Sequence, residues 1–204
     1  SSEWTVDVAS KVRDRAKFKK NVEWWDAPEK TYPNLTIGDR SIPFKDVLKI
    51  IAYYVTEGHI QKETRKSRST YGQPQSVQIA QTDKGKGWED ICELQSQTTA
   101  YRVCKTRHRC GIHNKDLARW ISEECGQLSH NKRLPQWLKL CDKSTLKLLL
   151  NYMINGDGSI RTRDRGNDKQ YYTYYTKSDK LRDDIVEISL KCGYFPRFRK
   201  RKTI

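Results

Sequence analysis

The chain has 204 residues, enough for one good-sized domain or two small ones. Lys and Arg number 40 and the formal net charge is +15, which favours a polyanionic partner, most often nucleic acid, over a basic surface that serves solubility alone. A membrane protein is disfavoured, because no apolar run approaches the roughly 20 residues that cross a bilayer, and the start of the chain lacks the apolar stretch of a signal peptide.

Residues 1–41 form a basic and then Trp-rich extension, which is either an arm that packs on the core or touches the ligand, or a remnant of an adjoining domain. Helical periodicity then covers residues 45–57, and Gly58 is a natural C-cap. Strands are predicted at 59–66 and 75–82, and together they form a hairpin.

The next predicted elements are an amphipathic helix at 87–97, strands within 100–113 and a helix at 114–126 that ends at Gly126. A linker follows at 131–143. The pattern then repeats with a helix at 144–157, strands at 159–165 and 170–176, a helix at 178–193 and a strand at 194–202. We therefore expect an α+β fold with a first half at 42–130 and a second half at 144–204.

The two halves form an internal repeat, in which Glu57 aligns with Asp157 and Gly58 with Gly158 at an offset of 100. The offset then falls to 94, as in Thr82 and Thr176, which is explained by a longer loop in the first hairpin. Such a repeat indicates two half-domains related by a pseudo-twofold axis. The second half lacks a last strand and final helix, and a shortened chain, a companion segment and a smaller natural half all remain open.

Six cysteines are too few for a disulfide scaffold, so we expect free thiols in an intracellular, reducing compartment. Cys104, His108, Cys110 and His113 are crowded enough to raise the question of zinc. Their spacing is not that of a CxxC site, and the segment reads as a strand pair with buried thiols and solvent-facing histidines. Zinc is therefore the disfavoured reading.

Glu57 and Asp157 each stand at the end of an apolar helix. If these helices pack along the pseudo-twofold, with Ala52 at the contact and the bulkier Tyr152 forcing some offset, the two carboxylates lie side by side. Like charges at close range raise each other's pKa, and two helix C-termini add negative potential. This arrangement recruits a hard divalent cation such as Mg²⁺, which activates water and stabilises a phosphodiester leaving group. The alternative is two polar residues at helix ends.

Basic and polar residues follow these acids along the strands. Alternation puts Arg161, Arg163 and Arg165 on one strand face, where Arg and Gln can read base edges while Lys holds phosphates. For each residue alone, a solvated strand face is the simpler reading, and the case rests on their number. The residues expected to bind DNA are Gln61, Lys62, Arg65, Gln78, Arg161, Arg163, Arg165, Tyr171, Tyr175, Arg197, Arg199 and Arg201.

The segments "IIAYYVTEG" (50–58) and "LNYMINGDG" (150–158) resemble the paired signature of the LAGLIDADG homing endonucleases. Three further segments resemble the family in the same order: "IPFKDVLK" before the first copy, "NKRLPQWL" before the second, and "YYTKSDKLRDDIVEISLKCGY" after the second hairpin. The resemblance covers the chain from about residue 42 to its end.

This resemblance implies two αββαββα half-domains whose saddle-shaped antiparallel sheets lie over a long, pseudo-palindromic double-stranded DNA site, in a monomer that cuts both strands with Mg²⁺ or Mn²⁺. By position, Glu57 and Asp157 would hold the metal, together with the preceding Thr56 and Gly156. Lys132 would take the place of the lysine that polarises the scissile phosphate or positions water in intein-type members.

Two departures from the family pattern are Tyr152, in place of a small residue, and Asn155, where Asp is common. The different reach of Glu57 and Asp157 predicts unequal cutting of the two strands. Splicing motifs are not found, so the chain is either free-standing or an endonuclease portion of a larger protein. A DNA-binding protein that has lost cleavage, or an RNA maturase of the same fold, is the alternative function.

Overall fold

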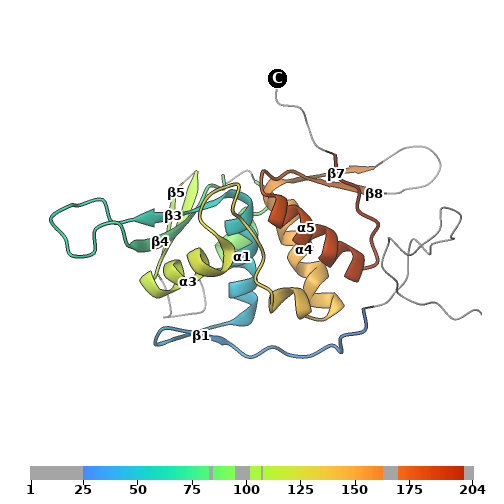
Figure 1. The fold of residues 1–204 in the computed structure, drawn as a ribbon, viewed down its shortest axis with the longest axis horizontal. Coiled ribbons are helices and arrows are strands. Elements are labelled where there is room, and N and C mark those ends of the chain that lie inside the picture. The colour runs from blue at the N-terminus through green and yellow to red at the C-terminus, as the bar shows by residue number, and fades with distance from the viewer. Residues whose placement is uncertain (1–24, 83–84, 95–101, 107, 163–169, 200–204) are drawn as a thin grey trace, which may run out of the picture.

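The structure is a computed structural model that describes residues 25–82, 85–94, 102–106, 108–162 and 170–199. Its helices and antiparallel sheets confirm the predicted α+β class. Two long helices, α1 (Phe44–Glu57) and α4 (Lys143–Asp157), pack against each other in the middle of the molecule. Each leads directly into a strand hairpin, and the two hairpins extend toward opposite ends of the molecule (Figure 1).

The strands that follow α1 belong to a four-stranded antiparallel sheet of order β3-β4-β6-β5. Helix α3 packs on β4 and against α1. The elements of this part are β3 (Gly58–Lys62), β4 (Pro74–Ile79), α2 (Trp88–Glu93), β5 (Arg102–Thr106), β6 (Arg109–His113) and α3 (Lys115–Cys125).

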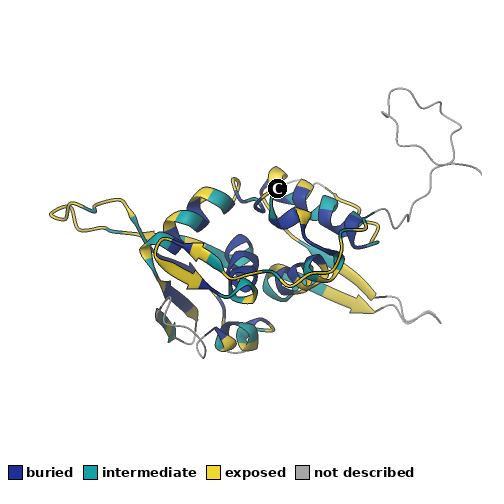
Figure 2. Ribbon diagram, turned by 90° about the horizontal axis from the view of Figure 1, so that it is seen from below, coloured by how far each residue is buried: buried dark blue, intermediate teal, exposed yellow. Residues whose placement is uncertain are grey.

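The part that follows α4 is smaller in the described residues. It consists of β7 (Gly158–Thr162), β8 (Gln170–Tyr174) and α5 (Asp179–Lys191), and α5 packs on α4. The β7–β8 ladder stands alone among the described strands, and it is largely exposed (Figure 2).

Most predicted elements form, but the first hairpin is shorter than predicted. Strand β3 ends at Lys62 and β4 at Ile79. Glu63 is the last residue whose backbone bonds across the hairpin, to Gln73 (3.0 Å) and Gly72 (2.9 Å). Its carboxylate accepts hydrogen bonds from the Arg65 backbone N–H (3.0 Å) and the Arg68 guanidinium (2.8 Å). These bonds organise the start of the long loop, which the sequence assigns partly to a strand.

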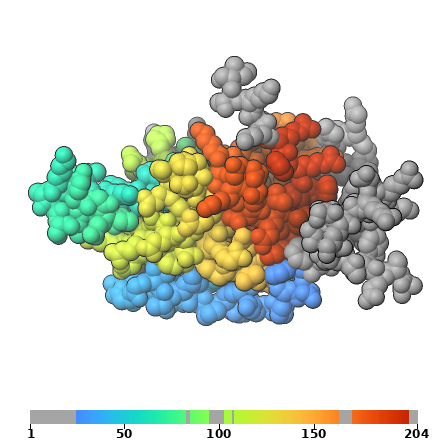
Figure 3. All heavy atoms as spheres, in the orientation of Figure 1, coloured from blue at the N-terminus to red at the C-terminus, as the bar shows by residue number. Residues whose placement is uncertain are grey.

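A hairpin of β1 (Leu35–Ile37) and β2 (Arg40–Ile42) lies inside the segment predicted to be an extension. Its turn contains Gly38 at φ 63°, a conformation that favours glycine. The preceding segment packs on the core, because the Trp25 indole donates to the Cys141 carbonyl (2.9 Å) and the Tyr32 hydroxyl accepts from the Asp142 N–H (2.8 Å). Figure 3 shows it along the lower edge of the molecule.

The predicted strand at 194–202 is wrong over its described part, because residues 194–199 are irregular. Pro196 has no N–H to donate to a ladder. The Tyr194 N–H instead bonds to the Ser189 carbonyl at the end of α5 (2.9 Å), and the Arg182 guanidinium lies 5.1 Å from the Phe198 ring centre. The segment therefore follows α5 and not a sheet, and residues 200–202 lie outside the described part.

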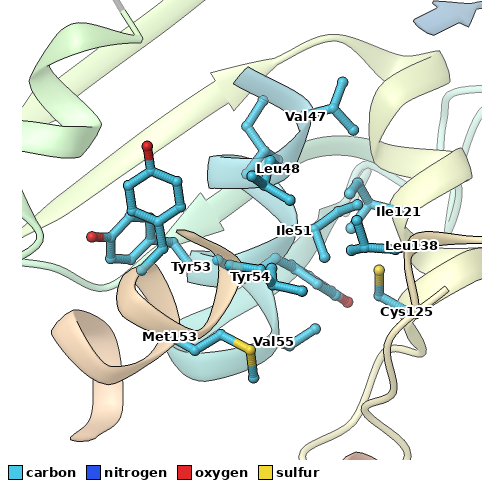
Figure 4. Packing of buried hydrophobic residues seen from close by; sticks show 14 of the residues in the cluster. Val47, Leu48, Ile51, Tyr53, Tyr54, Val55, Ile121, Cys125, Leu138 and Met153 are labelled. Atoms are coloured by element: carbon cyan, nitrogen blue, oxygen red, sulfur yellow. The ribbon is translucent and has the colours of Figure 1, made fainter. Parts of the chain in front are cut away.

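The core is centred on α1, in which every residue from 47 to 55 is buried. A helix that is buried on all sides is a central element and not a surface one. Tyr54 points toward Cys125 of α3, and Met153 of α4 lies near Val55 (Figure 4). The ends of α1 and α4 are consequently held in a packed interior. Among the described helices, none is both long enough and apolar enough to span a membrane.

Candidate active site

The last turns of α1 and α4 meet at a glycine. A Cβ added to Gly156 would lie 2.6 Å from Thr56 Oγ1 and 3.0 Å from Thr56 Cβ, so only glycine fits this contact without a shift. Each of these residues directly precedes a predicted catalytic acid, Asp157 or Glu57. The crossing therefore brings the two helix ends, and with them both acids, to one place.

The sequence predicts the close approach further up the helices, at Ala52 and Tyr152. Tyr152 instead lies beside Tyr53, with ring centres 6.2 Å apart, and its ring centre is 5.8 Å from the Lys49 ammonium. The bulky ring is thus accommodated beside the crossing, and the tight contact is supplied by Gly156.

The two carboxylates interact electrostatically. Burial, and then the charge of Asp157, raise the pKa of Glu57 to about 7. Burial also raises the pKa of Asp157, although that residue is more exposed than Glu57. Glu57 Oε2 is buried and has no hydrogen-bond partner among the described residues. A buried carboxylate oxygen without a partner is costly in free energy, which makes this pair a candidate site for a cation.

Thr56 and Gly156 contribute backbone to the same place. The last carbonyl groups of a helix lack partners within the helix, so they are free to accept from other groups. The Glu57 carbonyl is already used, since it accepts from the Ala80 N–H (3.2 Å). Thr56 Oγ1 donates back to the Tyr53 carbonyl (3.0 Å), which leaves the Thr56 carbonyl as the group for the predicted metal role.

Lys132 lies at the end of α1, where its ammonium is buried. Nζ donates to the Tyr54 carbonyl (2.6 Å) and the Gly58 carbonyl (2.8 Å), and it lies 3.2 Å from the Tyr54 ring centre. Burial lowers the pKa of Lys132 to about 7. Lys132 is 4% exposed, so its ammonium fixes the backbone on either side of Glu57. Its predicted role at a scissile phosphate stays a prediction.

His59, the second residue of β3, stands on the exposed side of the sheet next to this site. Burial, and then the positive charges of Lys132 and Arg109, lower its pKa. A neutral imidazole is therefore the form that faces solvent at neutral pH. His59 is not among the site residues predicted from the sequence.

Of the predicted DNA-binding residues on the first hairpin, Gln61, Lys62 and Arg65 are exposed. Gln78 is only 5% exposed, and its amide donates to Gln61 Oε1 (3.0 Å) and Ser76 Oγ (2.9 Å). In this structure Gln78 orients Gln61 and does not present its own amide to solvent.

On the second hairpin, Arg161 pairs directly with Tyr171 across the ladder, and both are exposed. Tyr175 follows β8 and is also exposed, while Arg197 and Arg199 are exposed in the irregular segment after α5. The remaining predicted contacts, Arg163, Arg165 and Arg201, lie outside the described residues.

The four residues weighed as a zinc site sit on or between β5 and β6. Cys104 is exposed and Cys110 is buried, and they are not paired across the ladder, where Cys104 faces Gly111. In the described part of the chain, no group of three or more His, Cys, Asp or Glu side chains is arranged to hold a metal ion. A cation at Glu57 and Asp157 would therefore need further oxygen ligands from backbone, water or a bound phosphate.

Tyr174 belongs to the site, although the sequence reading left it out. It pairs with Gly158 across the β7–β8 ladder, next to Asp157, and it packs partly buried against the core. Burial, followed by the charges of Asp157 and Glu57, raises the pKa of Tyr174. Tyr174 is therefore close enough to both acids to be affected by their charges. It belongs to a run of tyrosines, and the sequence alone does not fix which of them faces the acids.

Comparison with known proteins connects the chain with DNA. No model of a known protein family matches the sequence. The chain is 26% identical over 160 residues to a DNA polymerase of Thermococcus sp. (strain GE8). The aligned region covers 76% of this chain and 9% of the polymerase, so the chain spans less than a tenth of that relative's length. The similarity is therefore to a small part of a DNA-related protein.

Proposed function

We propose that this chain is a site-specific double-strand DNA endonuclease of the LAGLIDADG type, built from two similar halves. In this proposal α1 and α4 are the paired signature helices, and the hairpins that follow them lie along the DNA. Glu57 and Asp157 hold the divalent cation, Mg²⁺ or Mn²⁺, that hydrolysis of the phosphodiester bonds requires. The protein acts as a monomer, since both acids come from one chain.

The observation that carries the proposal is the meeting of the two acids at the Gly156–Thr56 contact. Glu57 Oε2 is buried without a hydrogen-bond partner among the described residues, and burial raises the pKa of both carboxyls, that of Glu57 further through the charge of Asp157. Oxygen ligands of this kind suit a hard divalent cation. The residues present therefore fit the metal, with Glu57 and Asp157 as ligands and the carbonyls of Thr56 and Gly156 as further candidates.

The bound cation would supply charge stabilisation at the scissile phosphate and lower the pKa of a bound water. The protein's own contribution is to hold two carboxylates at fixed helix ends. Lys132 fixes the backbone around Glu57 through Tyr54 and Gly58, and the Gly156–Thr56 contact fixes the distance between the helices. Hydrolysis then adds water across the P–O bond, with one oxygen becoming part of the new phosphate end and a proton going to the released hydroxyl.

Positive charge and sequence similarity support DNA as the substrate. The formal net charge of +15 is well suited to a phosphate backbone. Exposed Gln61 and Arg161 lie on the strands that leave the two acids, where side chains can reach base edges. The matched region covers 9% of the polymerase. A match of this size fits an endonuclease carried inside a larger protein, as in the intein-type members of the family, and we extend the proposal to an origin of this kind.

The first experiment selects DNA duplexes that the protein retains from a random library with Ca²⁺ present. The selected duplexes are then incubated with Mg²⁺ or Mn²⁺, and both strands are followed by end labels. We expect cleavage of both strands, and its loss in Glu57→Gln and Asp157→Asn at unchanged DNA affinity. Asp183→Asn, which removes an exposed carboxylate of α5 away from the site, is the matched control and should cleave normally.

Retention of DNA without cleavage under either metal would replace the nuclease by a DNA-binding protein of the same fold. Preferential retention of structured RNA over duplex DNA would favour an RNA maturase. Cleavage that survives both Glu57→Gln and Asp157→Asn would remove the proposed site from the mechanism.

A further inference from the structure

Tyr174 is placed beside the acids by the second hairpin alone. In each half a glycine follows the acid, and its partner across the hairpin occupies an equivalent position. These partners are Ile79, opposite Gly58, and Tyr174, opposite Gly158. They are 95 positions apart, one more than the predicted offset. Ile79 is fully buried and apolar, so strand packing at this position does not call for a hydroxyl group.

The hydroxyl of Tyr174 is available for bonding at the site. No hydrogen bond to it is found within the described residues, although the ring packs against the core. Its pKa is raised by burial and by the charges of Asp157 and Glu57, so it stays protonated at neutral pH. A protonated phenol is a hydrogen-bond donor, and the groups around this one, two carboxylates and the water or phosphate that they recruit, are acceptors.

We propose that Tyr174 is a positioning residue of the nuclease site, whose hydroxyl donates a hydrogen bond to the carboxylate–water cluster between Glu57 and Asp157. The inference rests on the proposed function and deepens it. A Cβ on Gly158 would lie 2.7 Å from Ile154 Cα, so the glycine lets β7 start close against the last turn of α4, and this brings its ladder partner Tyr174 to the helix end. The first half has Ile79 at this position, so only the second half supplies a hydroxyl donor. The two halves of the site therefore differ in this donor as well as in their acids, Glu57 and Asp157.

Tyr174→Phe tests the inference, because it removes the hydroxyl and keeps the ring. A hydrogen bond to a charged group typically contributes enough for roughly a ten- to hundredfold effect on rate. We expect single-turnover cleavage with Mg²⁺ to fall by that factor, with an unchanged melting temperature and unchanged DNA affinity in Ca²⁺. Tyr172→Phe is the matched control, since Tyr172 lies on the same strand face and bonds instead to Gln170 Oε1 (2.7 Å). It should cleave at the wild-type rate.

A second measurement does not depend on cleavage. The protein carries 11 tyrosines, and in a 3-fluorotyrosine-labelled sample the Tyr174 resonance is assigned in the ¹⁹F spectrum by its loss in Tyr174→Phe. On addition of Ca²⁺ without DNA we expect the Tyr174 signal to shift, and the Tyr172 signal to stay in place. The shift should be absent in the double variant Glu57→Gln/Asp157→Asn.

The outcomes separate this inference from the proposed function. Wild-type cleavage with an equally active Tyr174→Phe overturns the role of Tyr174 and leaves the nuclease standing. A wild-type protein that does not cleave removes the nuclease, and the ¹⁹F shift then decides whether Tyr174 senses a cation at the two acids. A Ca²⁺-insensitive Tyr174 signal overturns the inference in either case.

Discussion

Gly156 lies against Thr56 so closely that a Cβ on the glycine would come within 2.6 Å of the threonine hydroxyl oxygen. This contact sets the separation of the two helix ends that carry Glu57 and Asp157. The sequence shows two helices that end in an acid and a glycine, but it does not show which residues touch. The contact therefore turns a repeated motif into one site.

Gly156→Ala should lower stability even though alanine is the better helix former by about 1 kcal/mol. The added methyl group overpacks the contact with Thr56, which costs about 1–3 kcal/mol. This steric cost should outweigh the gain in helix propensity. Thr56→Ala removes the Oγ1 atom nearest the new methyl group, and the double variant should recover part of the loss. Urea unfolding of the four proteins measures the coupling, and strictly additive effects would contradict the contact.

Glu57→Gln should stabilise the metal-free protein at alkaline pH. The folded pKa of about 7 lies above the ordinary value of 4.5, so the wild type loses stability as pH rises from about 4.5 to 7, and the penalty is complete above pH 7. Because Glu57 is only half-buried and solvent screens its charge, we expect a gain for Glu57→Gln of about 1–2 kcal/mol at pH 8 and none at pH 4. Melting curves in chelator at both pH values test the sign.

Mg²⁺ should reverse this order. A cation that binds only the folded protein stabilises it by mass action, so millimolar Mg²⁺ should raise the melting temperature of the wild type at pH 8. Glu57→Gln should show no such rise, whereas Glu63→Gln, which changes a carboxylate in the first hairpin loop, should keep it. An equal response to Mg²⁺ in all three proteins would mean that the cation binds elsewhere.

The elements around the site were predictable because their signals are local. The apolar periodicity of α1 and α4, the acid followed by glycine at the end of each, and the alternation of the hairpin strands are all written in short windows of sequence. The N-cap of α3 is equally local, since Asn114 accepts from the Leu117 N–H (2.9 Å). The pairing of Glu57 with Asp157 followed from the repeat alone.

The remaining features depend on tertiary contacts. The sequence places Lys132 in the linker with a predicted role at the phosphate, but it does not show that the packing of the linker against α1 buries the Lys132 ammonium. Tyr174 and its neighbours form a tyrosine run in which a shift of one residue would exchange the two strand faces. The irregular path of residues 194–199 is set by Pro196 and by contacts with α5, and β-propensity alone did not reveal it.

Asp142 should make the protein sensitive to acid. Its side chain caps α4, with hydrogen bonds from the Ser144 hydroxyl (2.5 Å) and the Thr145 N–H (3.0 Å). Burial alone would raise the pKa of Asp142, but these bonds lower it to about 2. Because the folded pKa lies below the ordinary value, the stabilisation is complete above about pH 4 and is lost as pH falls toward 2.

Asp142→Ala should therefore cost about 2 kcal/mol at pH 7 and much less near pH 2. Asp142→Asn keeps an acceptor at the cap and should cost less than Asp142→Ala at pH 7. Urea unfolding at both pH values checks this dependence. A cost for Asp142→Ala that is equally large at pH 2 would contradict the role of the ionised carboxylate.

Asp184 and Asp183 are adjacent on α5 but differ sharply in surroundings. The Asp184 carboxylate is buried, where it accepts from the Lys139 ammonium (2.7 Å) and the Leu134 N–H (2.8 Å) of the linker. Asp183 is exposed and pairs with Arg182 on the helix surface. Removing one partner of a buried ion pair typically costs about 3–5 kcal/mol, whereas an exposed pair contributes about 1 kcal/mol or less.

Asp184→Ala should thus destabilise the protein by several kcal/mol, and Asp183→Ala should change the free energy of unfolding by about 0.5 kcal/mol or less. Replacing Lys139 as well, by Met, should recover part of the loss, because it removes a buried ammonium that has lost Asp184 and keeps Glu187 (3.0 Å) as its remaining acidic partner in the described residues. Since the linker also carries Lys132 to the end of α1, Asp184→Ala should weaken Mg²⁺ binding at the two acids under conditions where the variant is still folded. Equal unfolding free energies for Asp184→Ala and Asp183→Ala would show that the linker is not held through this carboxylate.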